Sequence, residues 1–302
     1  MVRFKAVRAS RLLLGAAIAL FILVAAALGL RLYLLSRAEP PAANASLVSA
    51  REDRQAETTS VLAASDAAPE PEPSAAPPAD ADRPSVLIYH THTHEAYEQV
   101  TADPYVAIEA WRTADAGHSV VRVGVELAAQ LRSLGFEVVH DVTDNEGDAL
   151  GTAYTRSLEM LEGYDRTFDL YIDLHRDACL DDAPFSADDG KPMARLMLLV
   201  GNGEGFDVKP YTAQNYAFAK ALTSEINRVQ PGLCKDVLVK DGRYNQNIGV
   251  FSILVEVGHN RNTLEEALSA MPPLATALHR LMVEAPRPEL TAMRAAYLKA
   301  RA

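Results

Sequence analysis

Apolar residues between positions 85 and 283 follow two alternating patterns, one typical of strands and one typical of helices. Short apolar runs, which indicate buried strands, occur at residues 86–89, 136–139, 170–174, 195–200, 237–239 and 252–257. Between these runs apolar residues recur at helical spacing, at residues 120–134, 153–162, 212–229 and 263–283. The alternation predicts an α/β fold of three layers, in which a mostly parallel, twisted sheet carries helices on both faces.

The N-terminal residues show a third pattern, an uncharged apolar run from Leu12 to Leu30. A run of roughly 20 apolar residues spans a bilayer as a helix, and the basic residues at positions 3–11 favour a cytoplasmic N-terminus. A cleaved signal peptide is the alternative, because small residues occupy 25–27, although its apolar region is usually only about 7–15 residues long. We predict a cytoplasmic stub and a retained transmembrane anchor at residues 1–37. Residues 12–35 would cross the cell membrane once and leave the rest of the chain extracytoplasmic.

Residues 38–84 follow neither pattern and are rich in Ala, Pro, Glu, Asp and Ser. Such a segment buries too little apolar surface to fold, and the prolines of residues 69–84 favour an extended, semi-stiff chain. We therefore predict a disordered linker at 38–84, a folded domain at 85–285, and a C-terminal tail at 286–302 that is either helical or loose.

Charge and cysteine content narrow the classes of function. The net charge of −11 and the lack of a Lys/Arg-rich stripe with interleaved aromatic residues argue against a nucleic-acid surface. Cys179 and Cys234 could form a disulfide outside the cytoplasm, or they could remain two buried thiols. Both alternatives stay open, because the sequence does not show whether the two thiols meet.

Side chains of the types that bind metal follow three of the predicted strands. His90, His92 and Glu95 come after the first strand, His175 follows 170–174, and Glu256 closes the last strand. In open parallel sheets, ligands bind beyond the carboxyl ends of the strands. We therefore expect a functional site at this edge of the sheet.

The residue types suit a catalytic zinc ion, which takes imidazole nitrogens and carboxylate oxygens and keeps one position open for water. We predict His92, Glu95 and His175 as ligands, because the short His-x-x-Glu spacing can bring His92 and Glu95 together in a tight turn. His90 is the substitute for His92, since the two share a face if the strand continues. Another acid, such as Asp115, is the alternative to Glu95 as third ligand.

Two further residues have predicted catalytic roles. Glu256 ends an apolar strand, where an unpaired carboxylate is costly to bury, so we expect it to act as a general base that takes a proton from water and passes it to the leaving amine. Arg176, directly after His175, is expected to polarise the scissile carbonyl or to hold a substrate carboxylate.

The sequence resembles the sporulation stage II protein P family of cell-wall amidases, over most of residues 85–282. The segments that carry the resemblance, in matching order and spacing, are VLIYHTHTHEAY (86–97), RTADAGHSVVRVGVELA (112–128), IDLHRDA (172–178), RYNQN (243–247) and ILVEVGHNRNTLEEA (253–267). The resemblance implies an amidase/zinc-carboxypeptidase-like fold and a membrane-anchored, zinc-dependent N-acetylmuramoyl-L-alanine amidase. Such an enzyme removes stem peptides from peptidoglycan in septal wall remodelling and engulfment during endospore formation.

The resemblance also implies roles for single residues. The family's histidine–glutamate motif falls on His90 to Glu95, its second motif on His175 to Asp177, and its catalytic glutamate on Glu256. Tyr244, Asn245 and Gln246 match a motif expected beside the substrate groove. The chain departs from the family at His94 and His259, where a small polar residue and a glycine are expected, and both add potential ligands.

The same resemblance implies peptidoglycan, the membrane and the sporulation stage II proteins D and M as partners. Two other functions stay open: a zinc endopeptidase that cuts stem-peptide cross-links with the same ligands, and a catalytically silent wall-binding scaffold. The scaffold has little need for clustered polar groups that are costly to bury. In a host that does not sporulate, the same chemistry would serve general wall remodelling.

Overall fold

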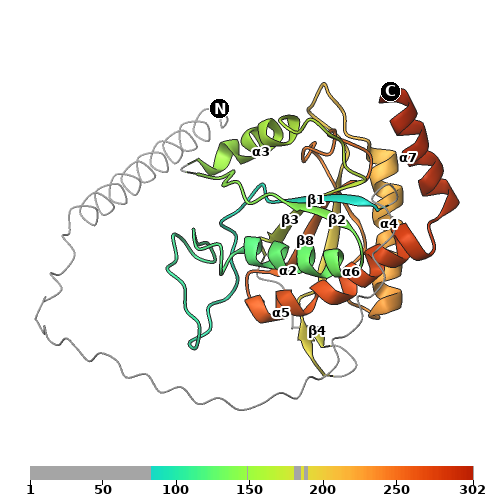
Figure 1. Ribbon diagram of the computed structural model, residues 1–302. Helices are drawn as coiled ribbons and strands as arrows, with labels where there is room; N and C mark the ends of the chain where they lie inside the picture. The colour runs from blue at the N-terminus through green and yellow to red at the C-terminus, as the bar shows by residue number, and fades with distance from the viewer. Residues whose placement is uncertain (1–82, 148, 180–184, 187–189, 302) are drawn as a thin grey trace, which may run out of the picture. The chain divides into compact units, whose positions relative to one another are not determined.

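The computed structural model describes residues 83–147, 149–179, 185–186 and 190–301. In this part of the chain a sheet of six strands has the order β2-β1-β3-β8-β6-β7 (Figure 1). The strands are β1 (Ser85–Tyr89), β2 (Glu137–His140), β3 (Leu170–Asp177), β6 (Leu196–Gly201), β7 (Leu238–Lys240) and β8 (Ser252–His259). Two short strands, β4 (Phe185–Ser186) and β5 (Pro192–Met193), pair separately and antiparallel.

The sheet is mixed but mostly parallel, as predicted. Strands β2, β1, β3 and β8 run parallel to one another, whereas β6 is antiparallel to β8. A parallel return would need a crossover that carries the chain back to the other end of the sheet. The described residues of the segment between β3 and β6 contain no helix, so β6 begins at the edge where β3 ends. The next strand, β7, is parallel to β6 after the crossover helix α4.

Helices cover both faces of the sheet. They are α2 (Val120–Ser133), α3 (Ala153–Glu162), α4 (Thr212–Val229), α5 (Leu264–Ser269), α6 (Met271–His279) and α7 (Pro288–Arg301), with a 3₁₀ turn at Leu150–Thr152 and a π turn at Arg280–Glu284. Val86 and Ile88 of β1 pack in the larger core with α2, α4 and α6, whereas Leu87 and Tyr89 pack on the opposite face with Leu161 of α3. This alternation is the period of a strand, and it confirms helices on both faces.

Local sequence accounts for the helix ends. Ser119 caps α2 by accepting a hydrogen bond from the Val121 N–H, and Gly135 after the helix adopts a φ of 89°, which glycine tolerates best. The predicted continuous helix 263–283 is wrong in one respect, because the chain forms α5, α6 and a π turn there. Prolines 272 and 273 lack the N–H groups that would continue α5 into α6.

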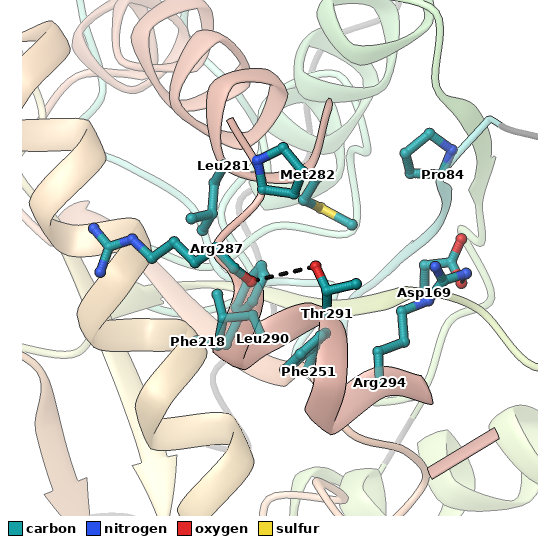
Figure 2. A pocket seen from close by; sticks show the side chains of 11 residues that line it. Pro84, Asp169, Phe218, Phe251, Leu281, Met282, Arg287, Leu290, Thr291 and Arg294 are labelled. Carbon is teal, nitrogen blue, oxygen red and sulfur yellow. Dashed lines mark hydrogen bonds and ion pairs between the residues drawn. The ribbon is translucent and has the colours of Figure 1, made fainter. Parts of the chain in front are cut away.

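The C-terminal tail is helical and packs on the domain. Leu290 and Tyr297 of α7 are buried, and Arg294 forms an ion pair with Asp169. Figure 2 shows the small apolar pocket beneath this helix, where Leu290 lies near Phe218 and Phe251. The predicted anchor and the linker up to residue 82 lie outside the described residues. Of the helices that are described, none is long and apolar enough to cross a membrane.

Candidate active site

A turn after β1 brings His92 and Glu95 over the end of β3. The Glu95 N–H donates to the His92 carbonyl (3.3 Å), which closes the turn. The turn begins at Thr91, whose N–H and hydroxyl both donate to the buried carboxylate of Asp173 (2.8 and 2.6 Å). These bonds tie the turn to β3, 82 residues further along the chain.

His175 lies between two carboxylates. Its Nδ1 is 3.4 Å from Glu95 Oε2, and its Nε2 is 2.9 Å from Asp173 Oδ1. The same Glu95 oxygen accepts the backbone N–H of Arg176 at 2.9 Å. All four of these residues are buried, so their charges act in a medium that screens them poorly.

His92 completes the group from the other side. Its ring meets the His175 ring edge to face, with centroids 5.3 Å apart, and its Nδ1 lies 3.2 Å from Glu146 Oε1. Glu146 is only 1% exposed. It also forms ion pairs with Arg112 and with His94, so the carboxylate is held firmly behind His92.

Glu256 faces this cluster from β8, directly opposite His175 in the strand register. The side chain is partly buried, and its Oε2 atom is enclosed with no hydrogen-bond partner among the described residues. Burial raises the pKa of Glu256 to about 8, despite the opposing charge of His175. A carboxyl group with such a pKa can exchange a proton near neutral pH.

At Glu95 and His175 the pKa shifts favour the charged forms. Burial opposes ionisation of Glu95, but His175 outweighs it and lowers the pKa of Glu95 to about 2. Burial also opposes a charge on His175, yet Asp173 and Glu95 raise its pKa well above the usual value. The cluster therefore stabilises positive charge between its carboxylates.

His90 lies apart from this cluster. The chain turns at Thr91, and the His90 ring is buried beneath α2, with Nδ1 2.9 Å from the Leu174 carbonyl oxygen and Nε2 2.9 Å from His140 Nε2. Both ring nitrogens are thus engaged, and the shared face expected of His90 and His92 is not formed. The structure leaves His92 as the member of this pair that contacts His175.

Of the other candidate ligands, Asp115 belongs to a separate group, whereas His94 shares the Glu146 carboxylate with His92. Asp115 accepts from the Gly117 N–H and pairs with His118, both at 2.8 Å, so it belongs to an exposed turn. His94 pairs with Asp144 and Glu146. The Nδ1 of His259 accepts the Arg261 N–H at 3.2 Å.

Arg176 serves the architecture of the site. Its guanidinium donates to the Trp111 carbonyl at 3.0 Å and to the side chain of Asn260. These bonds link the loop before α2 to the loop after β8. The guanidinium Nε is buried with no hydrogen-bond partner among the described residues, and the backbone N–H reaches Glu95, so the role of Arg176 toward substrate stays a prediction.

Within the 244–246 motif, Tyr244 and Asn245 line a pocket, and Gln246 bonds the backbone of a neighbouring strand. Tyr244 lines a pocket and meets Tyr154 edge to face, with centroids 5.8 Å apart. Asn245 is buried and donates to the Tyr154 carbonyl and to Ser157. Gln246 is buried and bonds the backbone of Leu199 and Gly201. Of the three predicted substrate-binding residues, Tyr244 and Asn245 thus line this pocket and Gln246 does not.

No disulfide joins Cys179 and Cys234. Cys234 is buried and lies 3.8 Å from the Thr223 hydroxyl. Sequence reasoning missed Asp173 and Glu146. Asp173 interrupts the apolar run 170–174, and that buried charge was the available signal; Glu146 lies in a loop with no comparable pattern.

The cluster consists of pairwise contacts. Within the described residues, no three His, Cys, Asp or Glu side chains are arranged so that they would hold a metal ion as they stand. Fold and site together define an α/β protein with a buried histidine–carboxylate site at the carboxyl edge of parallel strands.

The chain belongs to the Stage II sporulation protein P (SpoIIP) family, whose model matches residues 11–279. It is similar to stage II sporulation protein P of Bacillus subtilis (strain 168), with 29% identity over 203 residues, 61% of this chain and 48% of the relative. The alignment thus spans about half the length of that relative.

Two solved structures resemble the fold distantly. The catalytic domain of the CD27L endolysin targeting Clostridia difficile has 12% identity and a TM-score of 0.43, covering 67% of this chain and 98% of its own. N-acetylmuramoyl-L-alanine amidase from Clostridium difficile 630 has 12% identity and a TM-score of 0.39, covering 68% of this chain and 100% of its own.

Proposed function

We propose that the protein is a zinc-dependent peptidoglycan hydrolase that cleaves the amide between N-acetylmuramic acid and the L-alanine of the stem peptide. The observation that carries the proposal is Glu256, an enclosed carboxyl group with a raised pKa opposite the carboxylate-held His175. Membership in the SpoIIP family supports a role in sporulation.

The donor set fits zinc by its chemistry. Ligands on one tetrahedral zinc, at about 2.0–2.1 Å from the metal, lie about 3.3 Å apart, and His175 Nδ1 lies 3.4 Å from Glu95 Oε2. The Nδ1 of His92 faces Glu146, which leaves its Nε2 for a metal. Metal-bound histidines usually give their second nitrogen to a carboxylate, and here Asp173 and Glu146 have that position. His92, Glu95 and His175 would hold the ion.

A bound zinc would polarise the scissile carbonyl and acidify a water molecule. Glu256 takes a proton from the attacking water and delivers it to the leaving nitrogen of L-alanine. The new C–O bond forms first, and the C–N bond then breaks, which leaves a carboxylate on the lactyl group and a free amine on the peptide. Asp173 and Glu146 keep the two imidazole rings in the orientation that binding requires.

The cellular setting is part of the proposal. A transmembrane anchor at residues 12–35 would place the domain outside the cytoplasm, at the septal or forespore membrane if the host sporulates. There it would act on peptidoglycan with the sporulation stage II proteins D and M. The family match supports this setting.

The test uses the full-length chain with zinc supplied. The unmutated protein should bind about one zinc and release intact stem peptides from purified wall, measured by metal analysis and mass spectrometry. Glu256→Gln should keep zinc and slow release by about 100- to 10,000-fold, the usual contribution of general acid–base catalysis. Glu265→Gln changes an exposed glutamate and should behave like the unmutated protein.

Three other results would each point to a different function or mechanism. Conversion of cross-linked muropeptides to monomers, without free stem peptides, would identify a cross-link endopeptidase. Wall binding without zinc and without products would identify a scaffold. Full activity of Glu256→Gln would refute the proposed mechanism.

A further inference from the structure

A pocket of about 350 Å³ adjoins the candidate active site, and Tyr154 is the wall they share. The Tyr154 ring meets His92 edge to face with centroids 5.5 Å apart, and its other neighbour is Tyr244. Phe206 and Arg243 also line the pocket. The pocket thus begins one side chain away from a proposed zinc ligand.

The loop that carries Arg243 and Tyr244 is rigidly built. Tyr244 and Asn245 have φ angles of 50° and 51°, which non-glycine residues rarely adopt. The buried bonds of Asn245 to α3 hold this conformation. A Cβ at Gly201 would lie 2.6 Å from the Gly242 carbonyl and 2.9 Å from the Tyr244 ring, so β6 supports the loop from below. Strained backbone of this kind is typical of functional sites.

Arg243 is the unusual member of this pocket. Its guanidinium lies over the Phe206 ring, 4.9 Å from the centroid. Among the described residues no hydrogen bond or ion pair reaches this guanidinium, and its Nε is shielded from solvent. Arg166 and Arg294, in contrast, both face carboxylates. In a chain of net charge −11, an arginine held without a carboxylate partner points to an anionic ligand.

The aromatic walls favour an anionic peptide over a sugar. Sugars stack on open, flat aromatic faces, but the Phe206 face carries Arg243, and Tyr154 and Tyr244 meet edge to face at an interplanar angle of 79°. Guanidinium groups instead match the planar geometry of carboxylates, with two parallel hydrogen bonds.

We propose that Arg243 and this pocket bind a free carboxylate on the peptide portion of the substrate. The proposal rests on the proposed function, because the stem peptide is the anionic peptide that such an enzyme meets. Its second residue, D-glutamate, is joined through its side chain and keeps its α-carboxylate free. That group lies one residue beyond L-alanine, within about 7 Å of the scissile bond along an extended chain. Arg243 would thus bind the part of the substrate on the peptide side of the scissile amide.

The test measures binding separately from hydrolysis. Calorimetry with the zinc-loaded full-length chain compares the stem tripeptide with the same tripeptide whose D-glutamyl α-carboxylate is amidated. We expect amidation to weaken binding at least about tenfold, as for loss of a charge-assisted hydrogen bond. Arg243→Gln should lose as much affinity for the carboxylate form and become indifferent to amidation. Arg243→Lys should recover part of it, since the charge remains but the fork geometry is lost.

Arg132→Gln is the matched control, because Arg132 donates to the Val138 carbonyl at the far end of α2. It should bind both tripeptides as the unmutated protein does. Equal binding of the two tripeptides by the unmutated protein would overturn the proposal, and this comparison needs no variant to fold. An equal loss for both tripeptides in Arg243→Gln would overturn it as well.

Hydrolysis of purified wall by the same preparation separates the two proposals. Release of stem peptides without discrimination between the tripeptides would refute the carboxylate subsite and keep the reaction. Discrimination without any released peptide would keep the subsite and refute the reaction.

Discussion

Two histidine pairs, each with one buried and one half-buried ring, flank the end of β1, and their surroundings differ. His90 and His140 meet beneath α2, with Nε2 atoms 2.9 Å apart. Burial lowers the pKa of His90 to about 3 and that of His140 to about 4. Neither ring has a carboxylate within ion-pair distance among the described residues, so this pair stays neutral in the folded protein.

The second pair, His92 and His175, has a carboxylate at each ring. Asp173 and Glu95 flank His175, and Glu146 faces His92. His175 is buried like His90, yet its pKa is raised. Burial alone therefore lowers the pKa of an imidazole and favours its neutral form. Neighbouring carboxylates raise the pKa of an equally buried ring and favour its charged form. This difference separates a structural histidine pair from a candidate metal site.

The largest expected effect comes from replacing one histidine of each pair with glutamine and comparing the zinc content of the two variants. His175→Gln should lose zinc, because structural zinc sites bind with about 10–16 kcal/mol in total and one of three protein ligands would be gone. An affinity loss on the order of 3–5 kcal/mol follows. His140→Gln should keep one zinc per chain. Metal analysis after dialysis against a weak chelator measures the zinc content of both variants. Zinc retained by His175→Gln would contradict the assignment of His92 and His175 as the metal-binding pair.

The carboxylates behind the rings come next. Asp173→Asn and Glu146→Gln should each lower zinc affinity by about 10- to 100-fold, because they orient the ligating histidines without touching the metal. Competition with a fluorescent zinc chelator measures this loss. Glu137→Gln is the control, since Glu137 pairs with Arg166 at the surface. If the Asp173 and Glu146 variants matched this control, the carboxylates would have no role in holding the rings.

The distinction between the pairs was only partly predictable from the sequence. Periodicity located α2, α3 and α4 well, because each helix has one apolar face that must be buried. It could not give the direction of β6, since an apolar run reads the same in parallel and antiparallel strands. The expectation that His90 and His92 share a face assumed that β1 continues. It stops because Thr91 bonds to Asp173, a contact between distant parts of the chain.

The same limit applies to the site. His92, Glu95, His175 and Glu256 were found because each follows or ends an apolar run. Glu146 reaches His92 from the loop after β2, and nothing near it in sequence distinguishes this buried acid from the exposed acids of the chain. Arg176 was assigned to substrate because of its neighbour His175. The bonds of its guanidinium to Trp111 and Asn260 could not be predicted, because they depend on the packing of two loops.

The smallest effect concerns stability in acid. His140 has a pKa of about 4 in the folded protein, against about 6.5 for an unfolded chain. Between these values the unfolded chain binds more protons, so His140 contributes stability that is complete above pH 6.5 and is lost as pH falls toward 4. The slope for one such group is at most about 1.4 kcal/mol per pH unit, and less here because the ring is partly exposed.

The His140→Gln variant lacks this titrating group, so its free energy of unfolding has no contribution from residue 140 that depends on pH. Urea unfolding at pH 7 and pH 5 should show that the free-energy difference between the unmutated protein and the variant shrinks by about 1–2 kcal/mol toward the lower pH. Zinc release in acid affects both proteins and cancels in the difference, because His140 is not a proposed ligand. A constant difference would mean that His140 is already charged in the folded state. It would then resemble His175 in charge without having its carboxylates, and the contrast between the two pairs would no longer rest on electrostatics.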